Sequence, residues 1–157
     1  MKNKKVLITG GCGFIGSHLV EFFLKKDYFV FVLDKKGKRF SPDWIKDLKN
    51  KKLIKVYSNV VNRNVVFNLV KKVDIVIHLA ALISIPHSYK HPNLHIKTNI
   101  HGTYNVLEAC RKFKKKCIVT SSSETYGTGT SFPMNENHRL YAQSPYAATK
   151  ISADQLA

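Results

Sequence analysis

The sequence predicts an α/β fold, a doubly wound parallel sheet with the strand order 3-2-1-4-5. Three observations support this prediction. Short unbroken apolar runs alternate with segments of helical period, as in repeated strand-helix-strand units. A glycine-rich turn follows the first apolar run and leads directly into the first helical segment. The chain has 157 residues, of which 44% are apolar, and this is enough for a single domain with a sizeable core.

The first half of the chain is expected to supply three strands. Residues 6–9 form a buried apolar run, and residues 14–26 form a helix whose apolar side chains lie on one face. Residues 28–33 are the second strand, and residues 53–57 are the third. The second and third strands are therefore separated by an unusually polar stretch.

That stretch divides into a loop and a short helix. Residues 35–41 are polar and basic, which predicts a loop. Pro42 is expected to open a helix that continues through residue 48, because proline fits the first turn of a helix.

The second half begins with a helix over residues 65–71 and a fourth strand over residues 73–79. Pro86 and Pro92 follow, so the next segment must be a loop or a broken helix. A longer helix is then expected over residues 94–113.

The last predicted strand covers residues 117–121. A stretch rich in Ser, Thr, Gly, Pro and Asn follows it and is long enough to suggest a function. Ser144 and Pro145 are a suitable N-cap and first-turn pair for a final helix. No internal repeat and no second domain are evident.

Charge and composition limit the possible functions. The chain carries 26 Lys and Arg residues against 10 Asp and Glu, a formal net charge of +16. Most of the basic residues are Lys in short runs, whereas Arg is the residue expected at base edges. We therefore interpret them as solvated faces and expect no nucleic-acid partner, although the same field would favour anionic small-molecule substrates.

The sequence also indicates a soluble protein that is not exported. No apolar stretch approaches the roughly 18 residues of a membrane span, so no membrane partner is expected. Cys12, Cys110 and Cys117 contain no C-x-x-C pair, which argues against a disulfide framework or a zinc site and fits the cytoplasm. The thiol of Cys12 lies near a helix start and could have a lowered pKa. The favoured interpretation is that Cys12 is a small residue that fills space in the loop.

Three glycines shape the turn after the first strand. Gly10 and Gly13 permit a tight turn and a close approach of the backbone to a pyrophosphate, while Gly16 permits close helix-to-strand packing. The unpaired N–H groups at the helix start would then face the anion. The turn predicts a dinucleotide cofactor, and the alternative is an ordinary strand-to-helix turn.

An acidic residue at the end of the second strand favours NAD over NADP. Asp34 lies where a carboxylate accepts hydrogen bonds from the adenosine ribose hydroxyls and would repel a 2′-phosphate. Lys35 and Lys36 could tolerate such a phosphate, and a solvated turn residue is the alternative for Asp34 itself.

Tyr146 and Lys150 lie at positions i and i+4 of the final helix and hence on one face. An ammonium near a phenol favours the phenolate, so the pair can take a proton from a sugar hydroxyl while a nicotinamide takes the hydride. Ser122, after the fifth strand, could hydrogen-bond the same hydroxyl. A chance surface pair is the alternative.

These residues carry a family resemblance. The chain resembles the extended short-chain dehydrogenase/reductases, specifically the NAD-dependent nucleotide-sugar epimerase/dehydratase family with its Rossmann fold, along essentially its whole length. The matching stretches are TGGCGFIGSH at 9–18, HLAA at 78–81, NIHGT at 99–103, SSSETYG at 121–127 and SPYAATK at 144–150.

The resemblance implies a full set of site residues. Many relatives have an Asp where this chain has Asn59, whose amide can still accept a hydrogen bond from adenine. Asn99 would support the active-site helix. The implied catalytic residues are Ser122, Glu124, Tyr146 and Lys150. The implied NAD-binding residues are Gly10, Gly13, Phe14, Ile15, Gly16, Asp34, Asn59, Val60, Leu79, Ala80, Ala81, Asn99, Tyr146 and Lys150.

Glu124 selects among the reactions of the family. In the dehydratases a Glu at this place is the base that removes the proton at sugar C5, whereas simple 4-epimerases usually lack it. A C4 ketone acidifies C5–H, so that water can be eliminated across C5 and C6. We therefore expect a nucleotide-sugar 4,6-dehydratase, with a 4-epimerase, a decarboxylase or a non-catalytic NAD-binding module as alternatives.

The resemblance also implies that part of the protein is missing. Members of the family continue past this helix into a smaller substrate domain, whereas the chain stops at Ala157. We therefore expect residues 1–157 to be a truncated NAD-binding domain of an enzyme whose full-length form is a homodimer. His87, His91 and His95 are spaced by four, but Pro92 interrupts them, so no metal site is expected.

Overall fold

The computed structural model describes residues 4–35 and 43–157. Its five strands form one parallel sheet in the order β3-β2-β1-β4-β5, which confirms the predicted fold class and order. Leu7 in the central strand is in register with Phe31 on one side and Val76 on the other. The strands are β1 (Lys5–Thr9), β2 (Phe29–Asp34), β3 (Leu53–Tyr57), β4 (Ile75–His78) and β5 (Lys116–Val119).

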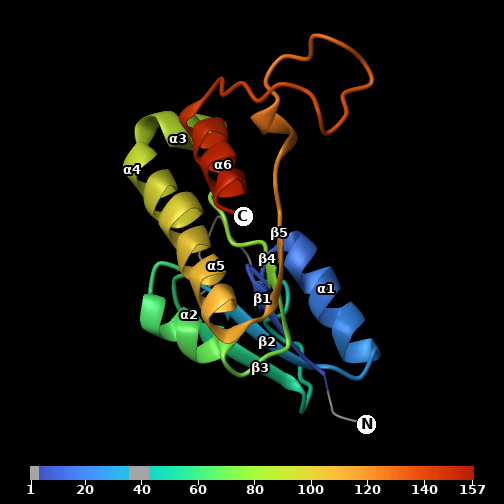
Figure 1. Ribbon diagram of the computed structural model, residues 1–157. Coiled ribbons are helices and arrows are strands. Elements are labelled where there is room, and N and C mark those ends of the chain that lie inside the picture. The colour runs from blue at the N-terminus through green and yellow to red at the C-terminus, as the bar shows by residue number, and fades with distance from the viewer. Residues whose placement is uncertain (1–3, 36–42) are drawn as a thin grey trace.

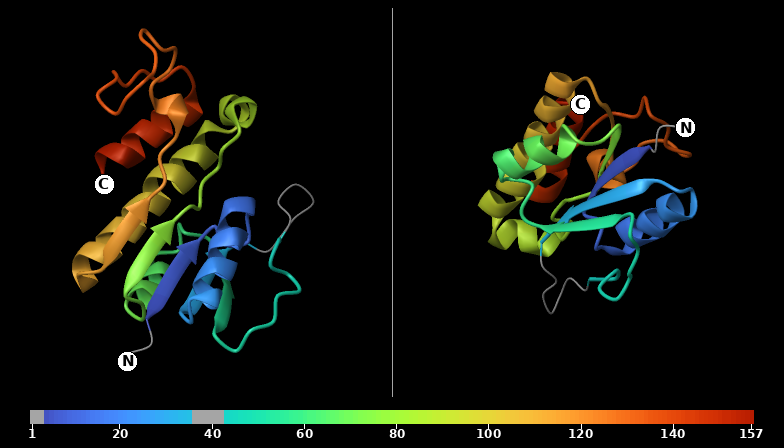
Figure 2. Two further views of the ribbon diagram at one scale, coloured as in Figure 1. Left: turned by 90° about the vertical axis from the view of Figure 1, so that its right-hand side faces the viewer. Right: turned by 90° about the horizontal axis from the view of Figure 1, so that it is seen from below.

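Helices cover both faces of this sheet, as Figures 1 and 2 show. The helix α1 packs on one face, and α2 and α5 pack together on the other. The helix α6 lies beyond the carboxyl ends of the strands, against α3 and α4. The helices are α1 (Phe14–Lys25), α2 (Arg63–Val70), α3 (Ile85–Lys90), α4 (Pro92–His95), the π-helix η1 (Ile96–His101), α5 (Gly102–Phe113), the 3₁₀ turn η2 (Ser123–Thr125) and α6 (Pro145–Gln155).

Alternation along β1 explains the two-sided core. Val6 and Ile8 pack with Val20 of α1, whereas Leu7 packs with Val66 of α2 and Val106 of α5. Because successive side chains of a strand point to opposite faces, an unbroken apolar run serves both layers at once. None of the described helices has the length and hydrophobicity that crossing a membrane requires.

The short helix expected through residue 48 is wrong for the part that the structure describes. Residues 44–47 form a turn, in which the carboxylate of Asp43 accepts the N–H of Ile45. The ammonium of Lys55 on β3 donates to the carbonyls of Ile45 and Lys46. The backbone bonds here span three residues, from the N–H of Lys46 to the carbonyl of Asp43 and from that of Leu48 to the carbonyl of Ile45, so the segment is a pair of tight turns and not an α-helix. Pro42, Lys36 and the predicted loop after Lys35 lie outside the described residues.

The helix expected over residues 94–113 is continuous but not uniform. The two prolines lie in the first turns of α3 and α4, and the break between these helices falls at His91. The chain then passes through η1 before it continues as α5. A π-helix takes one more residue into each hydrogen-bonded turn, a change that apolar periodicity did not reveal.

Candidate functional site

The glycine turn brings the end of β1 close to the end of β4. Gly10 has a φ of +73°, and its amide donates to the carbonyl of Leu33 at 2.9 Å. A Cβ at Gly10 would lie 2.9 Å from the backbone nitrogen of Ala80. The turn therefore requires glycine here, both for its left-handed backbone and for the close approach.

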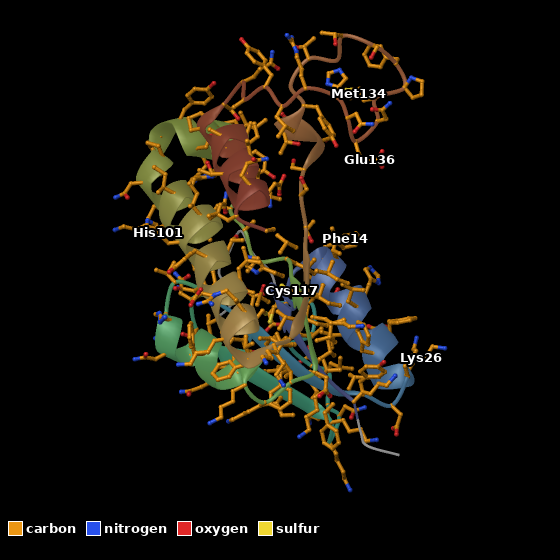
Figure 3. The ribbon with its side chains drawn as sticks, viewed as in Figure 1. Phe14, Lys26, His101, Cys117, Met134 and Glu136 are labelled. Atoms are coloured by element: carbon orange, nitrogen blue, oxygen red, sulfur yellow. The ribbon has the colours of Figure 1, made fainter. Side chains whose placement is uncertain are left out.

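The start of α1 lies directly behind this turn. A Cβ at Gly16 would lie only 2.2 Å from the carbonyl oxygen of Gly10, so α1 reaches the turn only because this residue is glycine. Gly13 is the N-cap and offers no side chain to the first-turn N–H groups. Phe14 and Ile15 are both 61% exposed, and Figure 3 shows Phe14 at this end of the helix. The turn thus has the backbone cradle and the uncapped helix start that fit a diphosphate.

Asp34 holds the neighbouring loops together. One carboxylate oxygen accepts the N–H of Cys12 at 2.9 Å, and the other accepts the N–H of Lys35 at 2.7 Å. Burial raises the pKa of Asp34. Burial, together with the carboxylates of Asp34 and Asp43, raises the pKa of the Cys12 thiol to about 12, so the lowered pKa considered for this cysteine is wrong. Cys12 is a small buried residue that fills space within the turn.

Asn59 and Val60 follow the third strand. The side-chain oxygen of Asn59 accepts the N–H of Val61 at 3.1 Å, so it shapes its own turn. Val60 is buried, and its carbonyl accepts a hydrogen bond from the amide of Asn105 at 3.1 Å. The backbone after β3 is therefore fixed by α5.

A buried chain of hydrogen bonds supports the end of β4 and was not assigned a role from the sequence. The N–H of Ala80 donates to the hydroxyl of Thr9 at 3.2 Å, and this hydroxyl lies 2.6 Å from Nδ1 of His78. On the other side, Nε2 of His78 lies 3.0 Å from the hydroxyl of Thr103. Since Thr103 donates to the carbonyl of Asn99, the ring must donate from Nε2 and accept at Nδ1.

His78 is therefore held neutral. Burial and, to a smaller extent, the positive charge of Lys150 together lower its pKa to about 4. The chain of hydrogen bonds joins β1, β4 and α5 just below Leu79, Ala80 and Ala81, which are half-buried at the carboxyl edge.

Asn99 joins the loop after β4 to the last helix. Its oxygen accepts the N–H of Leu82 at 2.8 Å. Its amide nitrogen donates to the carbonyl of Leu82 and to the hydroxyl of Thr149, each at 3.0 Å. Thr149 in turn donates to the carbonyl of Tyr146. Asn99 is 1% exposed and lies within η1, which aims it at α6.

Tyr146 and Lys150 are buried on the inner side of α6, each with 6% of its surface exposed. The helix begins at Ser144, whose hydroxyl accepts the N–H of Ala147 at 3.0 Å. The ammonium of Lys150 donates to the carbonyl of Thr120 at 2.5 Å, which ties α6 to the segment after β5. Burial lowers the pKa of Lys150.

Ser122 and Glu124 lie on the segment that follows β5. The hydroxyl of Ser122 caps η2 by accepting the N–H of Glu124 at 3.3 Å, and η2 packs against α6. Glu124 is exposed, and its carboxylate has no hydrogen-bond or ion-pair partner among the described residues. The structure thus places all the predicted site residues at one edge of the sheet, without a direct bond from Glu124 to Tyr146 or Lys150.

The three histidines before α5 form a cluster. Nδ1 of His87 lies 3.1 Å from Nε2 of His95, and the ring of His95 meets the ring of Tyr146 edge-on at 6.2 Å. His95 is fully buried, and its Nδ1 has no hydrogen-bond partner among the described residues. Burial and the nearby His87 and His91 lower the pKa of His95. Within the described part of the chain, no three His, Cys, Asp or Glu side chains could hold a metal ion.

Comparison with known proteins identifies the family. Residues 7–157 match the family model described as GDP-mannose 4,6 dehydratase. The chain is 38% identical, over 138 residues, to a UDP-N-acetyl-alpha-D-glucosaminuronate decarboxylase of Bacillus cytotoxicus, and the alignment covers 88% of this chain and 42% of that protein.

Solved structures share the fold. The dTDP-glucose 4,6-dehydratase DesIV of Streptomyces venezuelae, with NAD bound, superposes with a TM-score of 0.87 at 27% identity and covers 97% of this chain. A UDP-N-acetylglucosamine 4-epimerase of Methanobrevibacter ruminantium has a TM-score of 0.87 at 33% identity and covers 99%.

The chain spans about half the length of these proteins, 50% of the dehydratase and 49% of the epimerase. The decarboxylase, the dehydratase and the epimerase differ in reaction, but all three act on nucleotide-linked sugars, and the cofactor in the dehydratase structure is the NAD that the sequence predicts. The chain belongs to the family of the GDP-mannose 4,6 dehydratase model, the extended short-chain dehydrogenase/reductases that include nucleotide-sugar dehydratases and epimerases.

Proposed function

We propose that residues 1–157 are the NAD-binding domain of a nucleotide-sugar 4,6-dehydratase. The observation that carries the proposal is the single edge of the sheet that brings together the glycine turn at Gly10 and Gly16, the buried Tyr146 and Lys150 pair, and the exposed carboxylate of Glu124. A similar solved dehydratase holds NAD.

The cofactor would lie across this edge. Its diphosphate would meet the first-turn N–H groups of α1, including those of Phe14 and Ile15, and its adenosine ribose would meet Asp34. Asn59 and Val60 would lie beside the adenine, and residues 79–81 beside the nicotinamide half. When bound, NAD supplies the chemistry of accepting a hydride from sugar C4 and returning it to C6.

The proton chemistry falls to the chain's own side chains. Tyr146 would take the proton of the C4 hydroxyl, and Ser122 would hold that hydroxyl by a hydrogen bond. The ammonium of Lys150 would stabilise the phenolate and contact the ribose. Asn99 fixes the turn of α6 that carries the tyrosine. Catalysis at the C4 hydroxyl therefore depends on one helix being held in place.

Glu124 would remove the proton at C5. Its carboxylate is exposed and unengaged in the described structure, as a base that must reach a substrate atom requires. Loss of the C6 hydroxyl as water would complete the elimination. Ser123 stands where some dehydratases of the family have an Asp that protonates the departing hydroxyl, so this role is assigned to no side chain of the chain or falls to water.

A decarboxylase is the second candidate. It is favoured by the 38% identity to a decarboxylase acting on a nucleotide-linked N-acetylglucosaminuronate. The family resemblance implies that such decarboxylases also carry a Glu in this motif. In that reaction the C4 ketone would promote loss of CO₂ from the C6 carboxylate. The two candidates need different substrates, with a C6 hydroxyl for one and a C6 carboxylate for the other.

The test uses the complete protein with NAD and a panel of UDP-, GDP- and dTDP-linked sugars, including the uronates. We expect a 4-keto-6-deoxy product by NMR, and Glu124→Gln should slow its formation by roughly 100-fold or more. Glu21→Gln on the exposed face of α1 is the matched control and should leave the rate unchanged. A C4 epimer with its C6 hydroxyl intact, or release of CO₂, would reject the dehydratase.

Homodimerisation of the full-length protein belongs to the same proposal. Pro92, Ile96 and Ile100 line an apolar groove together with Ala148 of α6, a surface that a second copy could cover. Sedimentation of the complete protein as a monomer at micromolar concentration would reject it. The cytoplasmic location expected from the sequence stays a prediction.

A further inference from the structure

Lysines precede every strand of the sheet. The pairs at residues 4–5, 25–26, 51–52 and 71–72 and the triplet at residues 114–116 consist of lysine alone, and they stand at the entry to β1, β2, β3, β4 and β5 in turn. These eleven side chains come from five separate segments of the sequence. Their shared position relative to the strands is therefore a property of the fold.

All five entries lie at one edge, because the strands are parallel. Neighbouring strands are about 4.8 Å apart, so the five entries extend over a line of roughly 19 Å. Figures 1 and 2 show these entries at the end of the sheet opposite α6. Figure 3 shows the two ends of the domain along α1: Phe14 lies at the proposed cofactor end, and Lys26 lies at the end with the strand entries. We name this surface the lysine edge.

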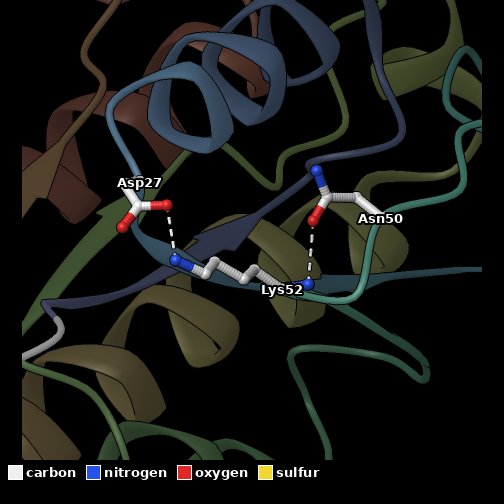
Figure 4. A network of polar contacts seen from close by, with 3 residues as sticks. All are labelled: Asp27, Asn50 and Lys52. Atoms are coloured by element: carbon white, nitrogen blue, oxygen red, sulfur yellow. Dashed lines mark hydrogen bonds and ion pairs between the residues drawn. The ribbon is translucent and has the colours of Figure 1, made fainter.

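Carboxylates at the same segments are few and already engaged. Asp27 pairs with Lys52, whose backbone N–H is held by Asn50 (Figure 4). Asp74 accepts the N–H of Lys5 at 2.9 Å. Most of the eleven lysines are exposed, so the edge presents a concentrated positive charge to solvent.

Helix termini account for only part of this arrangement. Lysines stabilise the carboxyl ends of helices, which explains Lys25 at the end of α1, Lys71 after α2 and Lys114 after α5. The pairs at residues 4–5 and 51–52 follow no described helix, since residues 43–50 are a turn and irregular backbone. At these two entries the charge therefore follows the strand and not a helix dipole.

We propose that the lysine edge binds the phosphate backbone of a nucleic acid without reading its sequence. Duplex DNA carries one charge per roughly 1.7 Å of axis, so a 19 Å line spans about eleven phosphates. Lysine is a point charge that suits phosphate contact, and Arg, the residue expected at base edges, supplies only 4 of the 26 basic side chains of the sequence.

The proposal does not depend on the reaction at the opposite edge. It revises the expectation that the chain has no nucleic-acid partner, because the sequence alone shows the number of lysines but not their common edge. The two sites lie at opposite ends of the strands, so a substrate and a nucleic acid can bind at the same time.

The test measures binding of the complete protein to a fluorescent 30-base-pair duplex of arbitrary sequence by anisotropy, between 50 and 300 mM KCl. We expect binding that weakens steeply with salt. The triple variant Lys71→Gln, Lys72→Gln and Lys116→Gln removes three exposed charges from the edge. It should lower the slope of log affinity against log salt by up to about 2.7 and reduce affinity at 100 mM KCl at least about tenfold.

The matched control is Lys46→Gln, Lys90→Gln and Lys97→Gln, which removes three exposed lysines outside the edge and should leave affinity and slope nearly unchanged. Arginine at the three edge positions should retain binding. The proposal is overturned if the wild type ignores the duplex at 50 mM KCl, if both triples weaken binding equally, or if the protein binds only vesicles containing phosphatidylserine. The triple edge variant should turn over substrate at the wild-type rate, so a loss of duplex binding can be told apart from a failure of the proposed reaction.

Discussion

The buried imidazole of His78 should make the stability of the domain depend on pH. In the folded protein its pKa is about 4, because burial and the charge of Lys150 disfavour the cation. In the unfolded chain the same ring titrates near 6.5. Since the folded pKa is the lower one, the stabilisation is complete above about pH 6.5 and is lost as the pH falls toward 4. At pH 5 the loss relative to pH 8 is about 2 kcal/mol.

The variant His78→Gln removes this titration. We expect the free energy of unfolding of the wild type, measured in urea, to fall by about 2 kcal/mol more between pH 8 and pH 5 than that of the variant. Other groups titrate equally in both proteins and cancel in the comparison. An equal fall in the two proteins would refute the reasoning, and so would an NMR titration that gives His78 a pKa near 6.5 in the folded wild type.

Three further predictions test the edge that would hold the cofactor. Gly16→Ala should lower the free energy of unfolding by about 2–3 kcal/mol and weaken NAD binding in calorimetry at least about tenfold, because its Cβ would lie 2.2 Å from a backbone oxygen. For Gly13→Ala the closest atom is 3.3 Å away, so a similar loss of stability there would contradict the steric argument. Asn99→Ala removes three hydrogen bonds and should cost about 3 kcal/mol in thermal unfolding, and an unchanged melting temperature would show that α6 is held by other contacts. Lys150→Met should reduce kcat by roughly 100-fold or more and raise the pKa of His78, as followed by NMR; a pKa that does not move would exclude the coupling.

The strand order could be predicted because it follows from patterns that are local in sequence. Each strand is a short apolar run, and parallel strands with right-handed crossovers leave few topologies. The helix through residue 48 failed for the opposite reason. The turn at residues 44–47 is held by the ammonium of Lys55, which donates to the carbonyls of Ile45 and Lys46 from β3, later in the sequence. Helix-start rules do not include such a tertiary partner.

The candidate site could likewise be predicted only in part. Its residues could be located because the carboxyl ends of parallel strands meet at one edge, where Asp34 ends β2 and Leu79 and Ser122 follow β4 and β5. The supporting contacts could not, since Thr9 and His78 are 69 residues apart. One signal was available: a histidine inside the apolar run of a predicted strand, as His78 is, must find hydrogen-bond partners within the sheet.

The π-helix η1 lets one continuous helix contact both α6 and the sheet, which lie in different directions from it. Asn99 within it reaches α6, whereas Thr103, one turn later, reaches His78 in the sheet. Deleting a single residue from η1 would restore ordinary winding and turn the preceding part by about 100°. The side chain of Lys97 on its outer surface is exposed, so its replacement would leave these contacts intact, whereas a change in the length of the stretch would not. Insertions and deletions there should be rarer than substitutions, because a change of one residue would uncouple the helix that carries Tyr146 from the sheet.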